Sequence, residues 1–290
     1  MAVTRRIKAG FKHLFGLHFP GHNLLVYPDD VFLVSYPKSG NTWTRFLVAN
    51  LAYPEKSPDF ANINDLLPDP EGMAKRKLDR APRPRILKSH HCFDPRFQKV
   101  IYVVRDPRDV VLSEYHYDIK RRAIAEGFPL DQFVARFVRG ELNHPYGTWG
   151  ENAASWFYTR RGDPRFLLVK YEALEAQPTV EMGRVADFLG IPGDRERLAF
   201  AIEQSSARRM RELEKKQAHL WSSTRETRKD KPFVRAAKSG GWKADLCEAS
   251  IAEIESAWGG IMRDLSYELV GLGLVVDGGT SNSAGQKSLL

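Results

Sequence analysis

The chain has 290 residues, of which 42% are hydrophobic, and it carries a formal net charge of +8 at pH 7. This composition is sufficient for a sizeable folded core and excludes an intrinsically disordered protein. The positive charge favours an anionic partner, whether a nucleotide, a nucleic acid, an acidic polymer or a membrane surface.

Apolar runs alternate with helical patterns along the chain. Short apolar and β-branched runs predict strands at residues 31–36, 85–90, 99–104 and 165–171. Helical spacing follows the first run, a second helix is predicted from Asp106 to Arg122, and a third spans residues 178–189 before Gly190. Because strands and helices alternate, we expect a single α/β domain with a central, mostly parallel sheet flanked by helices.

Three segments depart from this alternation. Residues 54–84 are rich in Pro, Asp and Arg, and residues 212–241 are highly charged, which makes both segments candidate lids over a site. Gly and Ser dominate the end of the chain. We therefore expect one domain over residues 1–276 and a disordered tail over residues 277–290.

The sequence also predicts the cellular location of the protein. Charged residues and glycine interrupt residues 11–19, so no secretory signal is expected, and the apolar runs are too short to cross a bilayer. Cys92 and Cys247 form no C-x-x-C pair and are expected to be packing residues, not zinc ligands or a disulfide. We expect a cytoplasmic protein with no membrane partner.

A phosphate-binding pattern joins the first predicted strand to its helix. It reads Tyr36-Pro37-Lys38-Ser39-Gly40-Asn41-Thr42-Trp43. A loop between a strand and a helix directs backbone N–H groups and the helix dipole at an anion. The pattern is not a Walker A loop, because its lysine precedes the glycine and Gly-Lys-Ser/Thr is absent.

This loop resembles the 5'-phosphosulfate-binding loop of the sulfotransferase family, Tyr-Pro-Lys-Ser-Gly-Thr-Thr-Trp, from which only Asn41 differs. The resemblance implies that Lys38 lies beside the oxygen that bridges phosphate and sulfate, where negative charge develops during transfer. Trp43 would stack on adenine. The residues that would hold the 5'-phosphate are Ser39, Gly40, Asn41 and Thr42.

A second strand-to-helix junction, at residues 102–116, resembles the family's 3'-phosphate-binding motif. The resemblance implies that Arg105 and Ser113 grip the 3'-phosphate, and an arginine fork can donate two hydrogen bonds to phosphate oxygens. Ser113 would also restrain Lys38 before the acceptor arrives. Arg108 and Asp109, in the same stretch, are interpreted as a surface charge pair.

Residues 87–91, between these motifs, resemble the family's Lys-Thr-His segment. Side chains alternate along a strand, so Lys88 and His90 are predicted to share one face, while Ser89 and His91 take the other. The resemblance makes His90 the general base, with Lys88 as a second catalytic group. Histidine suits the role because its ordinary pKa lets it accept a hydroxyl proton near neutrality. His91 is expected to be a packing residue.

Residues 233–243 partly match the family's third nucleotide-binding segment. The resemblance implies that Arg235 binds the 3'-phosphate. Tyr171 and Ser205 match two further nucleotide-contacting positions. The departures from the family pattern are Ala236, Ala237 and Gly241. One phosphate contact of the family is therefore in question here.

Together these motifs imply a sulfotransferase that moves the sulfuryl group of 3'-phosphoadenosine-5'-phosphosulfate (PAPS) by in-line displacement onto a hydroxyl or amine. The desulfated nucleotide (PAP) would be the product, and no metal would be required. The acceptor is expected to be a hydroxylated small molecule, with a saccharide as the alternative. Residues favouring an apolar acceptor pocket are Phe15, Phe19 and Tyr27. Residues favouring an acidic glycan, or a solvated loop, are Arg76, Lys77, Arg80, Arg83 and Arg85.

Two other classes of function stay open. A P-loop kinase or NTPase would share the strand-loop-helix phosphate site, but it needs a hydroxyl and carboxylates to hold magnesium. A nucleic-acid-binding protein is supported by the basic charge alone, and the basic residues are interspersed with acidic ones, so no nucleic acid partner is expected. The family's dimerisation motif is not intact, which leaves the oligomeric state open.

Overall fold

Four parallel strands form the sheet, in the order β2-β1-β3-β4. The computed structural model describes residues 24–142, 144–221, 223–235 and 237–271. Its strands are β1 (Val31–Ser35), β2 (Ile86–Ser89), β3 (Lys99–Val104) and β4 (Phe166–Lys170). The four predicted strands and the parallel α/β fold are therefore confirmed. Residues 11–19, with Phe15 and Phe19, and the predicted tail at 277–290 lie outside the described residues.

Helices connect the strands and cover the sheet. Those in the described residues are α2 (Asn41–Ala52), η2 (Pro54–Lys56), α3 (Ile63–Leu66), α4 (Lys75–Leu78), α5 (Pro107–Lys120), α6 (Leu130–Val138), η3 (His144–Tyr146), α7 (Trp149–Arg160), α8 (Tyr171–Ala176), α9 (Pro178–Leu189), α10 (Arg195–Gln204), α11 (Ala207–Gln217), α12 (Trp242–Asp245) and α13 (Glu248–Asp264).

Local sequence explains where the predicted helices begin and end. Helix α2 begins at Asn41, within the phosphate-binding pattern. Helix α5 begins at Pro107, and the side chain of Asp106 caps it by accepting a hydrogen bond from the Arg108 N–H. Helix α9 ends before Gly190, whose φ of 71° lies in the left-handed region. All three predicted helices are confirmed.

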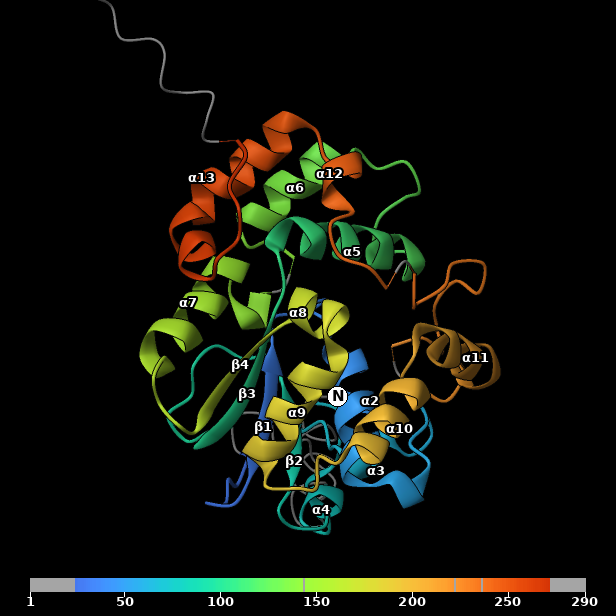
Figure 1. Cartoon of the computed structure of the whole chain (residues 1–290). Coiled ribbons are helices and arrows are strands. Elements are labelled where there is room, and N and C mark those ends of the chain that lie inside the picture. The colour runs from blue at the N-terminus through green and yellow to red at the C-terminus, as the bar shows by residue number, and fades with distance from the viewer. Residues whose placement is uncertain (1–23, 143, 222, 236, 272–290) are drawn as a thin grey trace, which may run out of the picture.

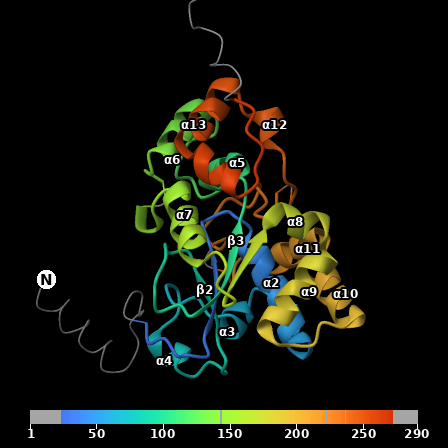
Figure 2. The ribbon, with the colours of Figure 1, turned by 60° about the vertical axis from the view of Figure 1, so that its left-hand side comes forward.

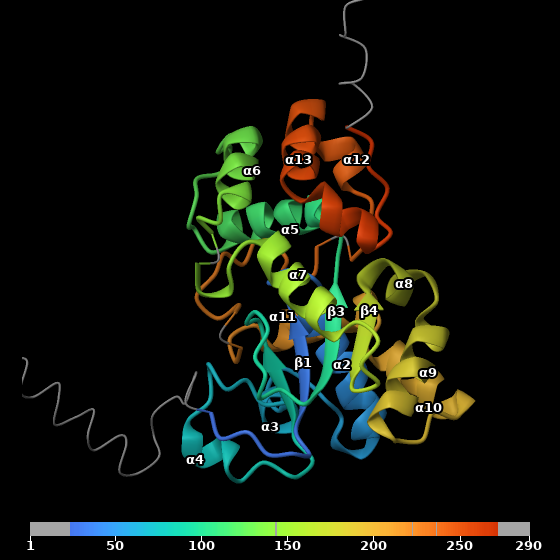
Figure 3. The ribbon, with the colours of Figure 1, turned by 90° about the vertical axis from the view of Figure 1, so that its left-hand side faces the viewer.

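Side chains alternate across the strands and build two cores. Phe32 and Tyr102 pack in a cluster with residues of α5, α6, α7 and α13, whereas Leu33 and Ile101 pack with residues of α2, α9 and α10. Figures 2 and 3 show α7 on one side of the strands and α2, α9 and α10 on the other. In Figure 1, α5, α6, α12 and α13 gather beyond one end of the sheet. The strands are therefore buried on both faces, as is usual for a parallel sheet.

The parallel register brings three chain exits to one edge of the sheet. Ser35 of β1 pairs with Val103 of β3, and β2 runs parallel to β1 along its other side. The chain leaves the three strands at Tyr36, His90 and Arg105. Ligands of open α/β sheets bind outside the carboxyl ends of the strands. The predicted site residues are thus expected to meet at this edge.

The two predicted lids differ in structure. Residues 54–84 contain the short helices η2, α3 and α4. Between α11 and Trp242, where α12 begins, the described residues contain no regular element. Strand β4 ends at Lys170, so Tyr171, which was predicted as the last strand residue, begins α8 instead.

Candidate active site

A cavity of about 740 Å³ lies at the carboxyl edge of the sheet. Its wall comes from the loop after β1, the end of β2, helix α5 and the segment after α11. The predicted site residues that line it are Lys38, Gly40, Asn41, Thr42, Trp43, Lys88, His90, Arg105, Ser113, Tyr171 and Arg235. The two other predicted residues, Ser39 and Ser205, are fully buried. Motifs far apart in the sequence therefore meet around one cavity.

The loop after β1 has the backbone shape of an anion cradle. Gly40 has a φ of 94°, and a Cβ at this position would lie 2.5 Å from the Tyr171 ring, so only glycine fits. Lys38 also has a positive φ, of 65°. Such turns direct successive backbone N–H groups to one side. The buried Ser39 Oγ has no hydrogen-bond partner among the described residues, which suits a loop that receives a polar ligand.

Trp43 is held in place by the residue that follows α10. Its Nε1–H donates to the Ser205 carbonyl oxygen at 2.9 Å, and its ring meets the Tyr171 ring edge-to-face at 5.4 Å. The Ser205 hydroxyl accepts a hydrogen bond from Asn50 at 3.2 Å. Ser205 therefore lies behind Trp43 and orients it, and its predicted contact with the nucleotide stays a prediction.

Two arginines face the cavity from different segments. The Arg105 guanidinium lies 4.2 Å from the centre of the Tyr171 ring and donates to the Lys238 carbonyl oxygen at 3.0 Å. Its buried Nε–H has no partner within the described part of the chain. Burial lowers the pKa of Arg235, and the charge of Arg105 adds to this effect. Two guanidiniums that repel each other at a cavity, one with a donor to spare, form a suitable site for a phosphate.

His90 is oriented by the neighbouring strand. Its Nδ1 lies 2.7 Å from the Ser35 carbonyl oxygen, which can only accept, so Nδ1 carries the hydrogen and Nε2 keeps its lone pair. Asn41 donates to the Ser35 hydroxyl at 3.1 Å, which ties the phosphate loop to the same strand end. Burial, reinforced by the Lys88 ammonium, lowers the pKa of His90 to about 3. The imidazole is therefore neutral at physiological pH and able to accept a proton.

The two lysines have different partners. The Lys38 ammonium lies 3.6 Å from the centre of the Tyr117 ring, and burial lowers the pKa of Lys38 to about 8 against the opposing charge of Glu114. Lys88 Nζ lies 2.6 Å from an Asp69 oxygen. Lys88 and His90 both line the cavity, as strand alternation predicted. Both lysines thus bring positive charge to the cavity that holds the neutral base.

The interpretation of Arg108 and Asp109 as a surface pair is wrong, because both residues are buried. Arg108 makes ion pairs of 2.6 Å with Asp106 and with Glu255 on α13. Asp109 accepts hydrogen bonds from the backbone N–H groups of Gly240, at 2.6 Å, and of the residue that begins α12, at 3.2 Å. These two residues fix α5 to the C-terminal helices and to the third nucleotide segment.

Three of the residues predicted to meet the acceptor are engaged elsewhere. The Tyr27 ring packs against the guanidiniums of Arg83 and Arg85, at 4.0 and 4.6 Å, outside the cavity described above. Arg85 is buried and pairs with Asp30 at 2.5 Å, and Arg83 pairs with Asp29. These basic side chains therefore carry no argument for an acidic glycan.

Several cavity residues were missed by sequence reasoning, namely Arg45, Asp69, Glu114, Tyr117 and Tyr146. Glu114 is 3% exposed, and burial raises its pKa to about 7 although Lys38 opposes the shift. It directly follows Ser113 in the second motif, which was the available signal. Nothing in the sequence around Asp69 indicates that it meets Lys88.

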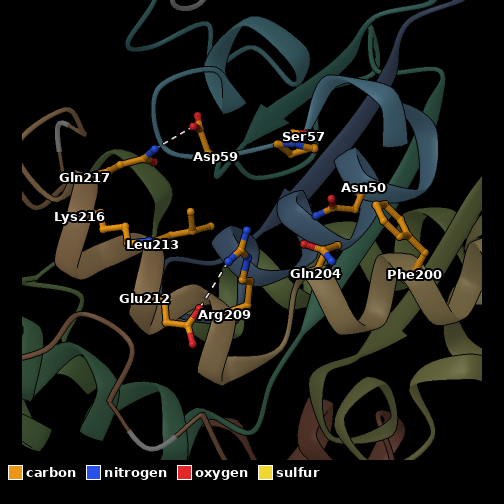
Figure 4. A pocket seen from close by; sticks show the side chains of 11 residues that line it. Asn50, Ser57, Asp59, Phe200, Gln204, Arg209, Glu212, Leu213, Lys216 and Gln217 are labelled. Atoms are coloured by element: carbon orange, nitrogen blue, oxygen red, sulfur yellow. Dashed lines mark hydrogen bonds and ion pairs between the residues drawn. The ribbon is translucent and has the colours of Figure 1, made fainter.

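A second cavity, of about 290 Å³, lies beside Asn50 of α2. Figure 4 shows its wall, formed by α11, the end of α10, Asn50 of α2 and the segment that carries Ser57 and Asp59. None of the predicted site residues is among its lining residues in the described chain. The larger cavity is therefore the candidate active site.

Within residues 24–142, 144–221, 223–235 and 237–271, every helix is too short or too polar to cross a membrane.

Comparisons with known proteins agree with this geometry. The chain is 30% identical to mouse sulfotransferase 2B1 over 245 residues, which cover 80% of this chain and 71% of that protein. It is 26% identical to rat sulfotransferase 1A1 over 267 residues, which cover 86% and 90% of the two chains. A mouse sulfotransferase complexed with PAP shares its fold with a TM-score of 0.65 at 23% identity, covering 82% of this chain and 85% of that one.

Retinol dehydratase, solved with androsterone and PAP, has the same fold with a TM-score of 0.67 at 22% identity, covering 86% of this chain and 85% of the other. The model of the sulfotransferase domain family matches residues 28–266, which include every residue described around the larger cavity. This protein therefore belongs to the sulfotransferase family.

Proposed function

We propose that this sulfotransferase moves the sulfuryl group of PAPS onto a hydroxyl group of a small-molecule acceptor and leaves PAP. The observation that carries the proposal is the meeting of three features in one cavity: a phosphate loop, an arginine with an unpaired donor, and a neutral histidine. A phosphosulfate donor needs the first two, and a hydroxyl acceptor needs the third.

The donor would lie across the phosphate loop. Backbone N–H groups of the loop would hold the 5'-phosphate, Trp43 would stack on the adenine, and Arg105 would take the 3'-phosphate. Residues assigned to the nucleotide with them are Ser39, Gly40, Asn41, Thr42, Ser113, Tyr171 and Arg235. The unpaired donors at Ser39 and Arg105 support this placement. PAP is present in solved proteins of the same fold.

The reaction would be an in-line displacement at sulfur. His90 Nε2 takes the proton of the acceptor hydroxyl while the oxygen forms its bond to sulfur. The bond between sulfur and the bridging oxygen breaks, and that oxygen leaves with the phosphate. The Lys38 ammonium stabilises the negative charge that grows on it, and Lys88 contacts the sulfuryl oxygens. No metal is required, because these lysines and Arg105 supply the positive charge.

The acceptor is proposed to be a small hydroxylated molecule that enters the part of the cavity beside His90. Tyr146, whose ring meets His90 edge-to-face at 5.5 Å, forms part of its wall. Retinol dehydratase, which has the same fold, has been solved with androsterone and with retinol, both small molecules. An amine or a saccharide acceptor is the alternative, and a cytoplasmic location stays a prediction.

A screen of acceptors with sulfur-labelled PAPS tests the proposal. Label should pass to hydroxylated small molecules, and transfer should persist in EDTA. Magnesium-dependent transfer of phosphate from ATP, with no transfer of sulfur label, would assign the chain to kinase chemistry instead. Sulfated saccharides as the only products would support PAPS as the donor and overturn the proposed acceptor class.

A further inference from the structure

Asp69, which belongs to none of the motifs found in the sequence, forms an ion pair with Lys88. Lys88 Nζ lies 2.6 Å from Asp69 Oδ2, and the two side chains are 16% and 20% exposed. Both residues line the cavity together with His90. We propose that Asp69 is a positioning residue, which holds the Lys88 ammonium beside His90 where the sulfuryl group is transferred. This inference rests on the roles proposed above for Lys88 and His90.

The backbone around Asp69 fixes the place of its carboxylate. The Lys88 N–H donates to the Pro68 carbonyl oxygen at 2.8 Å, so the residue before Asp69 pairs with the strand that carries the lysine. Proline on both sides of Asp69 restricts the local backbone. Asp69 Oδ1 accepts from the Glu71 N–H at 3.1 Å, which leaves Oδ2 for Lys88. The direction of the carboxylate is therefore set by the protein itself.

The Lys88–Asp69 pair lies among other charged groups, and both of its members affect the pKa of His90. Burial is the largest cause of the lowered pKa of His90; Lys88 lowers it further, and Asp69 opposes that effect. Arg45, on α2, adds a positive charge near Asp69 and is held by the Leu67 carbonyl oxygen at 2.5 Å. Since both partners are mostly buried, solvent screens these charges less than it screens a surface pair. Asp69 thus keeps a cation next to the base and offsets part of the effect of that cation on the pKa of His90.

The chemistry of an ammonium group allows this arrangement to serve transfer. The Lys88 ammonium has three N–H donors, so one can bind Asp69 while two remain for sulfuryl oxygens. Without Asp69, the flexible four-carbon stem of Lys88 would have to be ordered during each turnover. Displacement of a catalytic group by about 1 Å can lower a rate about 10²-fold. Asp69 would therefore affect kcat through Lys88, with no contact to substrate.

The informative variant is Asp69→Asn, because the amide oxygen can still accept from Glu71 while the negative charge is lost. The matched control is Asp65→Asn, the same change in the same segment, which removes an exposed ion pair with Lys77. Lys88→Met and the double variant, Asp69→Asn with Lys88→Met, complete a double-mutant cycle. The measurements are kcat, the KM for the acceptor, the Kd of PAP by calorimetry and the unfolding midpoint.

We expect Asp69→Asn to lower kcat about 10- to 100-fold, and Asp69→Glu, which keeps the charge, to recover part of that loss. PAP should bind all variants within about 2-fold, and in the Lys88→Met background the Asp69→Asn change should alter kcat by less than about 2-fold. Equal losses in both backgrounds would overturn the inference, and so would a raised KM at unchanged kcat. A fully active Lys88→Met variant would contradict the proposed function of Lys88 itself, and the inference with it.

Discussion

His90 donates its Nδ1 hydrogen to the carbonyl oxygen of Ser35 over 2.7 Å. Ser35 is the last residue of β1, and His90 follows the last residue of β2. The pairing of two strands therefore sets the orientation of the imidazole, and it selects the tautomer whose Nε2 can accept a proton. The ring of the proposed base is thus held by a main-chain oxygen and by its edge-to-face contact with Tyr146.

Replacement of this base should abolish turnover but leave nucleotide binding almost unchanged. Asparagine keeps a similar size but cannot take the proton, so His90→Asn should lower kcat by about 10²- to 10⁴-fold. The Kd of PAP should stay almost unchanged. The control is His91→Asn, which should change kcat little, because His91 pairs with Glu71 at 2.6 Å and is not among the described residues that line the cavity. Steady-state kinetics with calorimetry checks both variants, and a fully active His90→Asn protein would refute the assignment.

The pH profile should reflect the lowered pKa values of two groups. Lys38 must be protonated to stabilise the leaving oxygen, and its pKa is about 8, so kcat/KM for PAPS should fall as pH rises through about 8. His90 must be neutral, and its pKa is about 3. No acid limb is therefore expected between about pH 5 and 7, well above that pKa.

Lys38→Arg provides the control for this profile, because a guanidinium stays charged over the accessible range. The variant should lose the limb near pH 8 even if its rate is lower. Rates measured across the pH range, with a check that the protein stays folded, decide the matter. An acid limb close to the ordinary pKa of histidine would show that His90 is not the buried, neutral base described above.

The 3'-phosphate assignment can be tested with paired nucleotides. Arg105→Ala removes the guanidinium whose Nε–H is unpaired in the described chain, and Ser113→Ala removes a hydroxyl in the same cavity. Both changes should weaken the binding of PAP more than the binding of adenosine 5'-phosphate, which lacks the 3'-phosphate. A charge-assisted hydrogen bond contributes about 1.5–3 kcal/mol, so a loss of at least about 10-fold in PAP affinity is expected for Arg105→Ala. Calorimetry that finds equal losses for the two nucleotides would contradict the assignment.

The buried ion pairs of Arg108 should matter for stability. Arg108→Ala leaves the carboxylates of Asp106 and Glu255 without their partner, and loss of one member of a buried pair typically costs about 3–5 kcal/mol. Arg83→Ala is the matched control, since it removes an exposed pair and should leave the unfolding midpoint almost unchanged. Denaturant unfolding of both variants provides the comparison. Similar midpoints for the two would mean that α5 and α13 do not depend on Arg108.

The sequence was most informative where a function depends on local pattern. The strand, the glycine-containing loop and the helix around Gly40 lie within one short segment, and the alternation of Lys88 and His90 follows from strand geometry. Contacts between distant segments were not accessible in this way. Arg108 was interpreted as a surface residue because its partner Glu255 is 147 positions away in the chain. Asp69 carries no motif at all, and only packing brings it to Lys88.

The third nucleotide segment is held by its main chain. Asp109 and Glu175 accept hydrogen bonds from the N–H groups of Gly240 and Ser239, and Glu214 accepts from those of the two residues that precede Arg235. Its position therefore depends on these main-chain hydrogen bonds in addition to the packing of Phe233 and Trp242. Its exposed positions, such as Ala237, can exchange side chains with little loss of folding free energy. This makes it the part of the nucleotide site that is best suited to acquire a new donor preference by mutation.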